Sequence, residues 1–468
     1  MRLIDAIRYS QGSNIAFVGA GGKTTAIFRV AREILAKSGQ DQLPHCIFIT
    51  TTTHIGAWQA TLADHVVKIG SLTDISNLGK HIPEGAILFT GGESNDRLRG
   101  LPDEQLHALN SLAKKHAIPL LIEADGSHQH PLKAPALYEP VIPEFVETII
   151  VVAGLRGLEK PLSSEWVHRP ERFAILSRLN IGDQVTSEAL VNVLLHKDGG
   201  LKGLPANVRK IALLNQADTP ALQAQAKKIS ERLIGSYHSC IIASLIPGSE
   251  SESTKPEKNS LQQSTIFAVV EPIAGIILAA GGSSRFGQPK QLLDWNGEPM
   301  VRRVVNMALK AGLSPLVVVV GASGDDVAAV INDLPLRIVI NSEWSTGKSS
   351  TIKVGINSLP EELGGVVFLQ CDQPQIPQAL LKSLIETHQT NLSPIVAPLI
   401  DGQRGNPVLF DRITFSEFHS LQGEMGGRKL FSRFQVQWLN WIDKNLLLDI
   451  DTPADYEKLL AKYSQGEI

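Results

Sequence analysis

Short apolar runs alternate with segments long enough for helices along most of this chain, and that alternation narrows its possible folds more than any other feature. Buried parallel strands joined by helices produce such a rhythm. We therefore predict an α/β protein with mainly parallel sheets and with ligand sites at the carboxyl ends of its strands. The expected strands are 15–18, 46–49, 86–89, 119–122, 148–152, 210–214, 276–278, 315–320, 336–340, 365–369 and 395–397. A helix is expected over 298–311, where apolar residues share one face.

A polar, serine-rich stretch interrupts this rhythm near the middle of the chain. Residues 248–264 show no apolar periodicity, which is typical of a linker. The chain has 468 residues, more than one ordinary hydrophobic core accommodates. We predict an N-terminal domain over 1–247, a linker over 248–272 and a C-terminal domain over 273–468.

The composition argues against several classes of partner. The formal net charge is −3 and like charges do not cluster, which disfavours nucleic acid or an anionic membrane. Cys46, Cys240 and Cys371 lie far apart, which disfavours a disulfide framework or a structural zinc site. No apolar segment reaches the length of a membrane span. We expect a soluble, cytoplasmic protein that binds small anions or other proteins.

The C-terminal half opens on a glycine-rich loop typical of phosphate binding. A short apolar strand leads into glycines that let the backbone turn tightly and direct N–H groups at phosphate oxygens. The sequence matches neither a Walker A nor a G-x-G-x-x-G turn. We predict a triphosphate site with charge from Arg285 and Lys290. Its nucleotide-binding residues are expected to be Leu278, Ala279, Ala280, Gly281, Gly282 and Ser283.

Carboxylates follow apolar runs at two further places in this half. Asp372 comes directly after the run 366–369, and Asp449 and Asp451 lie on one face of an extended segment. Separated carboxylates of this kind can share one Mg²⁺, which prefers oxygen ligands and bridges to nucleotide phosphates. Helix capping is the alternative role, for Asp372 and for Asp451 before a helix expected over 454–462.

Two polar turns complete the C-terminal set. Ser349 and Ser350 open an expected helix, and Arg404, Gly405 and Asn406 form a tight turn before an apolar run. We interpret both turns as facing an anion or the substrate.

The N-terminal half has its own phosphate signature, which we call the P-loop segment (residues 19–25). A strand leads through glycines into a helix that begins with Lys-Thr-Thr. Phe17 stands where a Walker A has its first glycine, so the loop is shortened. We predict nucleotide binding, with Lys23 on phosphate oxygens and Thr24 on Mg²⁺; a tight strand-to-helix turn is the alternative. The residues assigned to this site are Gly19, Gly21, Gly22, Lys23, Thr24 and Thr25.

Other N-terminal strands also end on polar residues. Glu123 and Asp125 alternate at the end of an apolar strand, as in a Walker B segment, and buried carboxylates are costly without partners. Asn215-Gln216-Ala217-Asp218 is similar to the Asn-Lys-x-Asp guanine reader of GTPases, with Gln216 in place of lysine.

Residues 273–468 resemble MobA-like nucleotidyltransferases, most closely the molybdenum cofactor cytidylyltransferase family. The resemblance rests on the opening loop, on Cys371-Asp-Gln-Pro and on further segments at 344–350, 402–407, 423–428 and 449–453. Glu424 departs from the family pattern, which usually has aspartate there. The resemblance implies a Rossmann-like nucleotide-diphospho-sugar transferase fold and transfer of CMP from CTP to molybdopterin with release of pyrophosphate. It further implies Arg285, Lys290 and Asp372 as catalytic residues.

The same resemblance implies the ligands of the site. Mg²⁺ would bind Asp372 together with Asp451 or Asp449, and we favour Asp451. The expected substrate-binding residues are Ser349, Ser350, Arg404, Gly405, Asn406 and Arg428. Ala280 is similar to the cytidylyl branch, because guanylyltransferases usually have glycine there. Another nucleotidyltransferase, using GTP or a sugar phosphate, stays an alternative, as does a non-enzymatic cofactor carrier or chaperone.

Residues 1–245 resemble the accessory (YqeC-like) proteins of selenium-dependent molybdenum hydroxylases. The similarity rests on the P-loop segment and on segments at 50–55, 123–127, 131–135, 139–143 and 152–158. It implies an NTP-binding accessory domain that takes ATP or GTP. Fusion to a cytidylyltransferase suggests that both halves mature one cofactor, with an apo molybdenum hydroxylase as possible partner.

Overall fold

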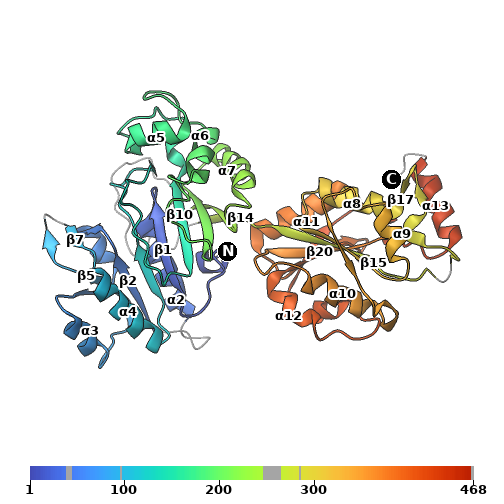
Figure 1. Cartoon of the computed structure of the whole chain (residues 1–468), viewed down its shortest axis with the longest axis horizontal. Helices are drawn as coiled ribbons and strands as arrows, with labels where there is room; N and C mark the ends of the chain where they lie inside the picture. The colour runs from blue at the N-terminus through green and yellow to red at the C-terminus, as the bar shows by residue number, and fades with distance from the viewer. Residues whose placement is uncertain (38–44, 95–96, 246–264, 284–285, 465–468) are drawn as a thin grey trace. The chain divides into compact units, whose positions relative to one another are not determined.

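The computed structural model describes residues 1–37, 45–94, 97–245, 265–283 and 286–464. The chain forms two units, Met1–Val270 and Glu271–Ile468. Each unit is built around its own sheet (Figure 1).

The first unit contains a nine-stranded sheet in the order β14-β13-β12-β10-β1-β8-β2-β5-β4. All neighbouring strands are parallel except β13 and β14, which run antiparallel. In sheet order, the strands are Thr265–Val270, Ser239–Ser244, Arg209–Asn215, Thr148–Gly154, Asn14–Gly19, Leu120–Glu123, Cys46–Thr51, Gly85–Thr90 and His65–Lys68. The central strands β1, β2 and β8 are buried almost throughout, as expected where helices cover both faces of a parallel sheet.

Helices and short strands connect these elements. The helices are α1 (Leu3–Ala6), α2 (Lys23–Lys37), α3 (Leu72–Leu78), α4 (Asp103–Lys115), α5 (Pro170–Ser177), α6 (Ser187–Leu195) and α7 (Pro220–Leu233). Thr186 and Thr219 cap α6 and α7 by accepting backbone hydrogen bonds, and Pro220 suits the first helical position. Two small sheets are added by β3 (His54–Gly56), β6 (Glu93–Ser94), β7 (Arg97–Arg99), β9 (Leu132–Lys133) and β11 (Val167–His168).

The second unit contains an eight-stranded sheet in the order β19-β18-β15-β20-β23-β21-β22, with β24 also paired to β21. The first four strands are parallel, and β23 runs antiparallel to both of its neighbours. In sheet order, the strands are Arg337–Ile340, Leu316–Val320, Ile273–Ala279, Gly365–Gln370, Val408–Asp411, Ile395–Ile400 and Gln403–Arg404, with β24 at Val436–Asn440.

Helices cover both faces of this second sheet. Successive residues of β15 alternate between two apolar clusters, one containing Ile277 and the other Ile276. Helices α8 (Met300–Lys310) and α11 (Gln378–Asn391) pack in the first cluster, and α10 (Lys348–Asn357) packs in the second. The remaining helices are α9 (Gly324–Ala329), α12 (Phe415–Phe418) and α13 (Pro453–Ser464). The predicted α/β class with mainly parallel sheets is confirmed.

Two boundaries differ from the sequence-based predictions. Helix α8 begins at Met300 rather than residue 298, because Glu298–Pro299 form β17 and pair with β16 (Asp294–Trp295). Residues 265–270 of the predicted linker are strand β14, whose backbone pairs with β13. The serine-rich stretch itself, 248–264, lies outside the described residues. Among the described helices, none is long and apolar enough to cross a membrane.

Candidate nucleotide sites

The loop after β15, which we call the glycine loop (residues 280–283), is held by one buried glutamine. Gln291 Nε2 donates to the carbonyl oxygens of Ala279, at 3.1 Å, and Gly281, at 2.8 Å. Ser283 Oγ lies 3.1 Å from Gln291 Oε1 and accepts a hydrogen bond from the Lys290 backbone at 2.9 Å. These bonds fix the path that we predicted for phosphate binding and bring Lys290 beside it. The prediction for Arg285 lies outside the described residues.

The predicted cation and carboxylates of this unit meet at the end of β20. Lys290 Nζ lies 2.5 Å from Asp372 Oδ2 and 3.9 Å from an oxygen of Asp451. The Ile450 backbone N–H donates to the Asp372 carbonyl at 3.3 Å, which ties the two acidic segments together. The structure therefore places Lys290, Asp372 and Asp451 in one cluster.

Asp449 belongs to the same cluster. Gln373 Nε2 donates to Asp449 Oδ1 at 2.7 Å. Burial raises the pKa of Asp449, and the nearby charge of Asp372 raises it further. Asp372 Oδ1 is buried and has no hydrogen-bond partner among the described residues. Two carboxylates that repel each other, one with an unpartnered oxygen, form a donor set that suits a divalent cation.

The protein alone supplies few ligands for that cation. Within the described ranges, no three His, Cys, Asp or Glu residues are grouped as a metal site would require. Because Mg²⁺ prefers six oxygens, the remaining ligands would have to be water and phosphate.

A pocket of about 550 Å³ opens beside this cluster. Its lining includes the predicted residues Arg404, Asn406 and Arg428, together with Asp449 and Glu424. Glu424, the departure from the family pattern, thus keeps its carboxylate at the pocket. The apolar part of the lining is Leu278, Ile352, Val408, Met425 and three phenylalanines, Phe368, Phe410 and Phe431.

Two cations in the pocket are partly desolvated. Lys348 Nζ donates to Gln370 Oε1 at 2.8 Å, and burial lowers the pKa of Lys348. The Arg404 guanidinium lies 4.7 Å from the centre of the Phe431 ring, a cation–π contact. Burial and the charge of Arg428 lower the pKa of Arg404. An anionic ligand would relieve both costs.

Three predicted substrate residues also make hydrogen bonds within the protein. The Ser349 backbone donates to the Gly423 carbonyl at 3.0 Å, and Ser350 Oγ lies 2.9 Å from the Gly347 carbonyl oxygen. The Gly405 backbone N–H donates to the Pro398 carbonyl oxygen at 3.0 Å. These residues shape the turns that border the pocket. Lys348 was missed as a site residue, although its position at the start of α10 among small hydroxyl residues was a usable signal.

In the first unit, the P-loop segment joins β1 to α2. Gly19, Gly21 and Gly22 have φ angles of 96°, 86° and 120°, which favour glycine. A Cβ atom on Gly21 would lie 2.4 Å from the backbone of Gly154. Only glycine therefore fits there. The turn leads into the N-terminus of α2, the end of a helix that attracts phosphate.

Lys23 and Thr24 contact the carboxylates that end β8. Lys23 Nζ donates to the Gly19 carbonyl at 2.7 Å and lies 3.2 Å from Asp125 and 3.7 Å from Glu123. Thr24 Oγ1 donates to Glu123 Oε2 at 2.8 Å. Burial raises the pKa of Glu123, although Lys23 opposes this shift. Lys23 and Thr24 thus contact the carboxylates that the sequence likens to a Walker B segment.

A chain of ion pairs continues from Asp125. Lys133 Nζ lies 2.8 Å from both Asp125 and Glu139, and Arg169 lies 2.9 Å from Glu139. Burial opposes ionisation of Glu139, but Lys133 and Arg169 lower its pKa to about 2. Lys133 and Glu139 fall in segments that carried the family resemblance, yet no spacing marked them as partners.

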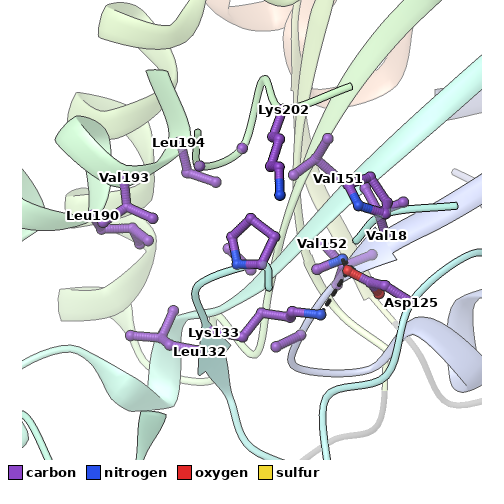
Figure 2. A pocket seen from close by; sticks show the side chains of 17 residues that line it. Val18, Asp125, Leu132, Lys133, Val151, Val152, Leu190, Val193, Leu194 and Lys202 are labelled. Carbon is purple, nitrogen blue, oxygen red and sulfur yellow. Dashed lines mark hydrogen bonds and ion pairs between the residues drawn. The ribbon is translucent and has the colours of Figure 1, made fainter. Parts of the chain in front are cut away.

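A small pocket lies behind the P-loop segment. Figure 2 shows Lys133 pointing toward Asp125, with Leu190, Val193 and Leu194 of α6 on the opposite wall. Lys202 Nζ, also at this pocket, donates to the Leu137 carbonyl at 2.8 Å. Most of the lining is aliphatic, so this pocket does not suit a triphosphate.

Known proteins and family models match both halves of the chain, in the regions where the sequence showed a family resemblance. A family model described as a MobA-like NTP transferase domain matches residues 275–438, and one described as YqeC protein matches residues 15–171. The chain is 31% identical over 214 residues to an uncharacterized protein YqeC of Escherichia coli, covering 46% of this chain and 80% of that protein.

Further relatives cover about two fifths of the chain. A nicotine blue oxidoreductase of Paenarthrobacter nicotinovorans is 28% identical, over 40% of this chain and 96% of its own length. A probable molybdenum cofactor guanylyltransferase of Bacillus cytotoxicus is 26% identical, over 41% of this chain and 98% of its own length. Among solved structures, Rv0371c of Mycobacterium tuberculosis is 29% identical, covering 41% of this chain and 98% of that one, with a TM-score of 0.37.

These matches confirm both family resemblances and the Rossmann-like nucleotidyltransferase fold of the second unit. The chain belongs to the YqeC family through its N-terminal half and carries a nucleotidyltransferase domain of the MobA-like family in its C-terminal half.

Proposed function

We propose that the second unit is a molybdenum cofactor cytidylyltransferase, which transfers CMP from CTP to molybdopterin and releases pyrophosphate. One observation carries the proposal: Lys290 and the carboxylates of Asp372, Asp449 and Asp451 meet beside the glycine loop, next to a pocket lined by cations. This arrangement supplies charge for a triphosphate on one side and for an anionic acceptor on the other.

The acceptor phosphate attacks the α-phosphorus of CTP. An oxygen–phosphorus bond forms there, the bond from the α-phosphorus to the bridging oxygen breaks, and the electron pair leaves with pyrophosphate. The attacking phosphate is already ionised at neutral pH, so the protein needs no general base. Its task is positioning and charge stabilisation. The glycine-loop amides and Lys290 hold the leaving pyrophosphate.

Asp372 and Asp449 are the residues that would hold a divalent cation such as Mg²⁺. When bound, it would neutralise charge on the α-phosphate. The sequence favoured Asp451 as the second ligand. However, Asp449 lines the pocket, and burial together with the nearby charge of Asp372 raises its pKa. Asp451 has a side chain that is 56% exposed and lies near Lys290, so we assign it to that ion pair.

The acceptor side is the 550 Å³ pocket. Arg404, Arg428 and Lys348 lie there. The negative charge of a phosphate would offset the cost of burying the charges of Arg404 and Lys348. Phe368 and Phe410 offer apolar surface for the flat pterin rings. We therefore place the molybdopterin phosphate at the cations.

CTP should be preferred over GTP by at least tenfold, which needs only about 1.4 kcal/mol of differential transition-state binding. The preference rests on Ala280, which directly follows β15 where related guanylyltransferases usually have glycine; its methyl group would leave room for a pyrimidine and crowd a purine.

The test combines the protein with molybdopterin, Mg²⁺ and equimolar CTP and GTP, and measures pyrophosphate and the dinucleotide formed. Cytosine dinucleotide supports the proposal. Predominant guanine dinucleotide would overturn the substrate but leave the reaction type. Tight cofactor retention without pyrophosphate would identify a carrier instead.

We further propose that the first unit binds an NTP with Mg²⁺. The contacts of Lys23 and Thr24 with the end of β8 support this role. An accessory role toward an apo molybdenum hydroxylase follows only from the fusion of both halves in one chain. Adding ATP or GTP to the protein should protect the amides of residues 19–30 from hydrogen exchange.

A further inference from the structure

The end of β12 and the three residues after it (residues 215–218) contact the P-loop segment. In the sheet, β12 and the carboxylate-bearing β8 lie on different sides of β1. Asn215 is 3% exposed, and its Nδ2 donates to the Gly21 carbonyl at 2.7 Å. Its Oδ1 accepts from the Leu245 backbone at 3.0 Å. Asn215 therefore links the P-loop segment, through Gly21, to Leu245, the residue after β13.

Gln216 lies against the same turn. Its φ angle is 62°, an unusual value for a residue other than glycine. A Cβ atom on Gly154 would lie 2.3 Å from Gln216 Oε1 and 2.9 Å from the Cα atom of Gly21. Gln216 Oε1 is buried, and it has no hydrogen-bond partner within the described part of the chain. The amide of Gln216 therefore packs against the backbone of the P-loop segment.

Asp218 is held in a fixed orientation two residues further on. Ser244 Oγ donates to its Oδ1 at 2.5 Å, and Arg156 Nε donates to its Oδ2 at 2.5 Å. The Asp218 side chain is only 15% exposed. A carboxylate has about four lone-pair sites, so both oxygens can still accept hydrogen bonds.

We propose that residues 215–218 bind the base of a guanine nucleotide whose phosphates lie on the P-loop segment. This rests on the proposed NTP binding by the first unit. Guanine presents adjacent N1–H and N2–H donors, which match the two oxygens of Asp218. Adenine presents an acceptor at N1, which would face a carboxylate oxygen unfavourably. A bidentate contact of this kind discriminates between bases by about tenfold or more.

The test measures binding at this site in the full chain, because the second unit also takes a nucleotide. Hydrogen exchange of the peptide 19–30 is followed while GTP, ITP, ATP or XTP is titrated with Mg²⁺. We expect GTP to bind at least about tenfold more tightly than ATP. ITP, which lacks the exocyclic amine, should also bind more weakly than GTP.

The Asp218→Asn variant provides the sharper test. Xanthine has a carbonyl where guanine has its amine, and an asparagine amide can donate to that carbonyl. The variant should lose affinity for GTP and gain affinity for XTP by about tenfold each. Asp326→Asn, an exposed change in α9, is the matched control and should leave all four affinities unchanged.

The outcomes separate the two proposals. Equal protection by ATP, ITP and GTP in the unmodified protein would overturn guanine recognition while NTP binding stands. Protection by ATP alone would do the same. No protection by any nucleotide would overturn NTP binding, and guanine recognition with it. Loss of GTP binding in Asp218→Asn without a gain for XTP would overturn the role of that carboxylate.

Discussion

Removing the Lys23 side chain should destabilise the first unit as well as remove a phosphate contact. Lys23 is 1% exposed and lies within 3.7 Å of both Asp125 and Glu123. Losing one partner of a buried ion pair typically costs 3–5 kcal/mol, because a buried charge is left uncompensated. Lys133 still neutralises Asp125, so we take the lower end, about 3 kcal/mol, for Lys23→Ala.

Native-state hydrogen exchange measures this cost in the full chain without nucleotide. A loss of about 3 kcal/mol corresponds to a roughly 100-fold fall in protection at amides that exchange only through global opening of the unit. Peptides from β1 and β8 report on the first unit, and peptides from β15 serve as an internal reference. Lys115→Ala, an exposed change in α4, is the control and should alter protection little.

A second substitution isolates the cause. If uncompensated charge produces the loss, adding Glu123→Gln to Lys23→Ala should restore part of the protection, by about fivefold or more. A fall of less than a few-fold in the single variant would refute the reasoning, and so would a double variant less stable than the single one. The result also affects how a loss of nucleotide binding in Lys23→Ala is interpreted. Such a loss could come from destabilisation of the unit as well as from the missing phosphate contact.

The other predictions concern carboxylates in both units. Asp372→Asn should leave the fold intact and lower cytidylyl transfer by about 100-fold or more, because an amide is a poor Mg²⁺ ligand; near-normal turnover at saturating Mg²⁺ would contradict this. Asp449→Asn should cost more activity than Asp451→Asn in the same assay, and equal small losses would make the segment structural. Glu123→Gln should raise the stability of the first unit at pH 8, measured by pulse proteolysis in urea. Burial raises the pKa of Glu123 in the folded state, so stability falls as the pH rises above the unfolded pKa of about 4.3. The advantage should vanish at about pH 3, where the carboxyl is protonated in both states. A pH-independent advantage would show that charge is not its cause.

Most strands that the sequence predicts are buried, although the partly exposed edge strand β19 was predicted and the buried strand β13 was not. Central strands such as β1 and β20 form uninterrupted apolar runs, which local composition reveals. The edge strands β4 and β24 are largely exposed and carry no such run, so composition cannot separate them from loops. Strand β14 was hidden for another reason: its antiparallel partner β13 is separated from it by the polar stretch, and register over that distance has no local marker.

Some residues of the candidate site could likewise be predicted from the sequence, and others could not. Lys290 and Asp372 were predictable because the carboxyl ends of parallel strands meet at one edge of a sheet. Gln291 and Gln373, which orient the glycine loop and Asp449, were not predicted. Glutamine is common on protein surfaces, so its presence in a sequence indicates no particular role. Only the fold shows that its amide bridges two segments of the chain.

Strand β14 changes what a break in the serine-rich stretch would mean. That strand ends at Val270 and β15 begins at Ile273, so only Glu271 and Pro272 join the last strand of one sheet to the first strand of the next. A protease that nicked the chain between β13 and β14 would leave β14 held to β13 by backbone hydrogen bonds along the register Cys240–Val270 to Ser244–Thr265. The cleaved pieces should then co-purify, as in a split protein that reassembles by strand complementation. Expressing residues 1–247 alone would instead leave the β13 edge unpaired and prone to self-association.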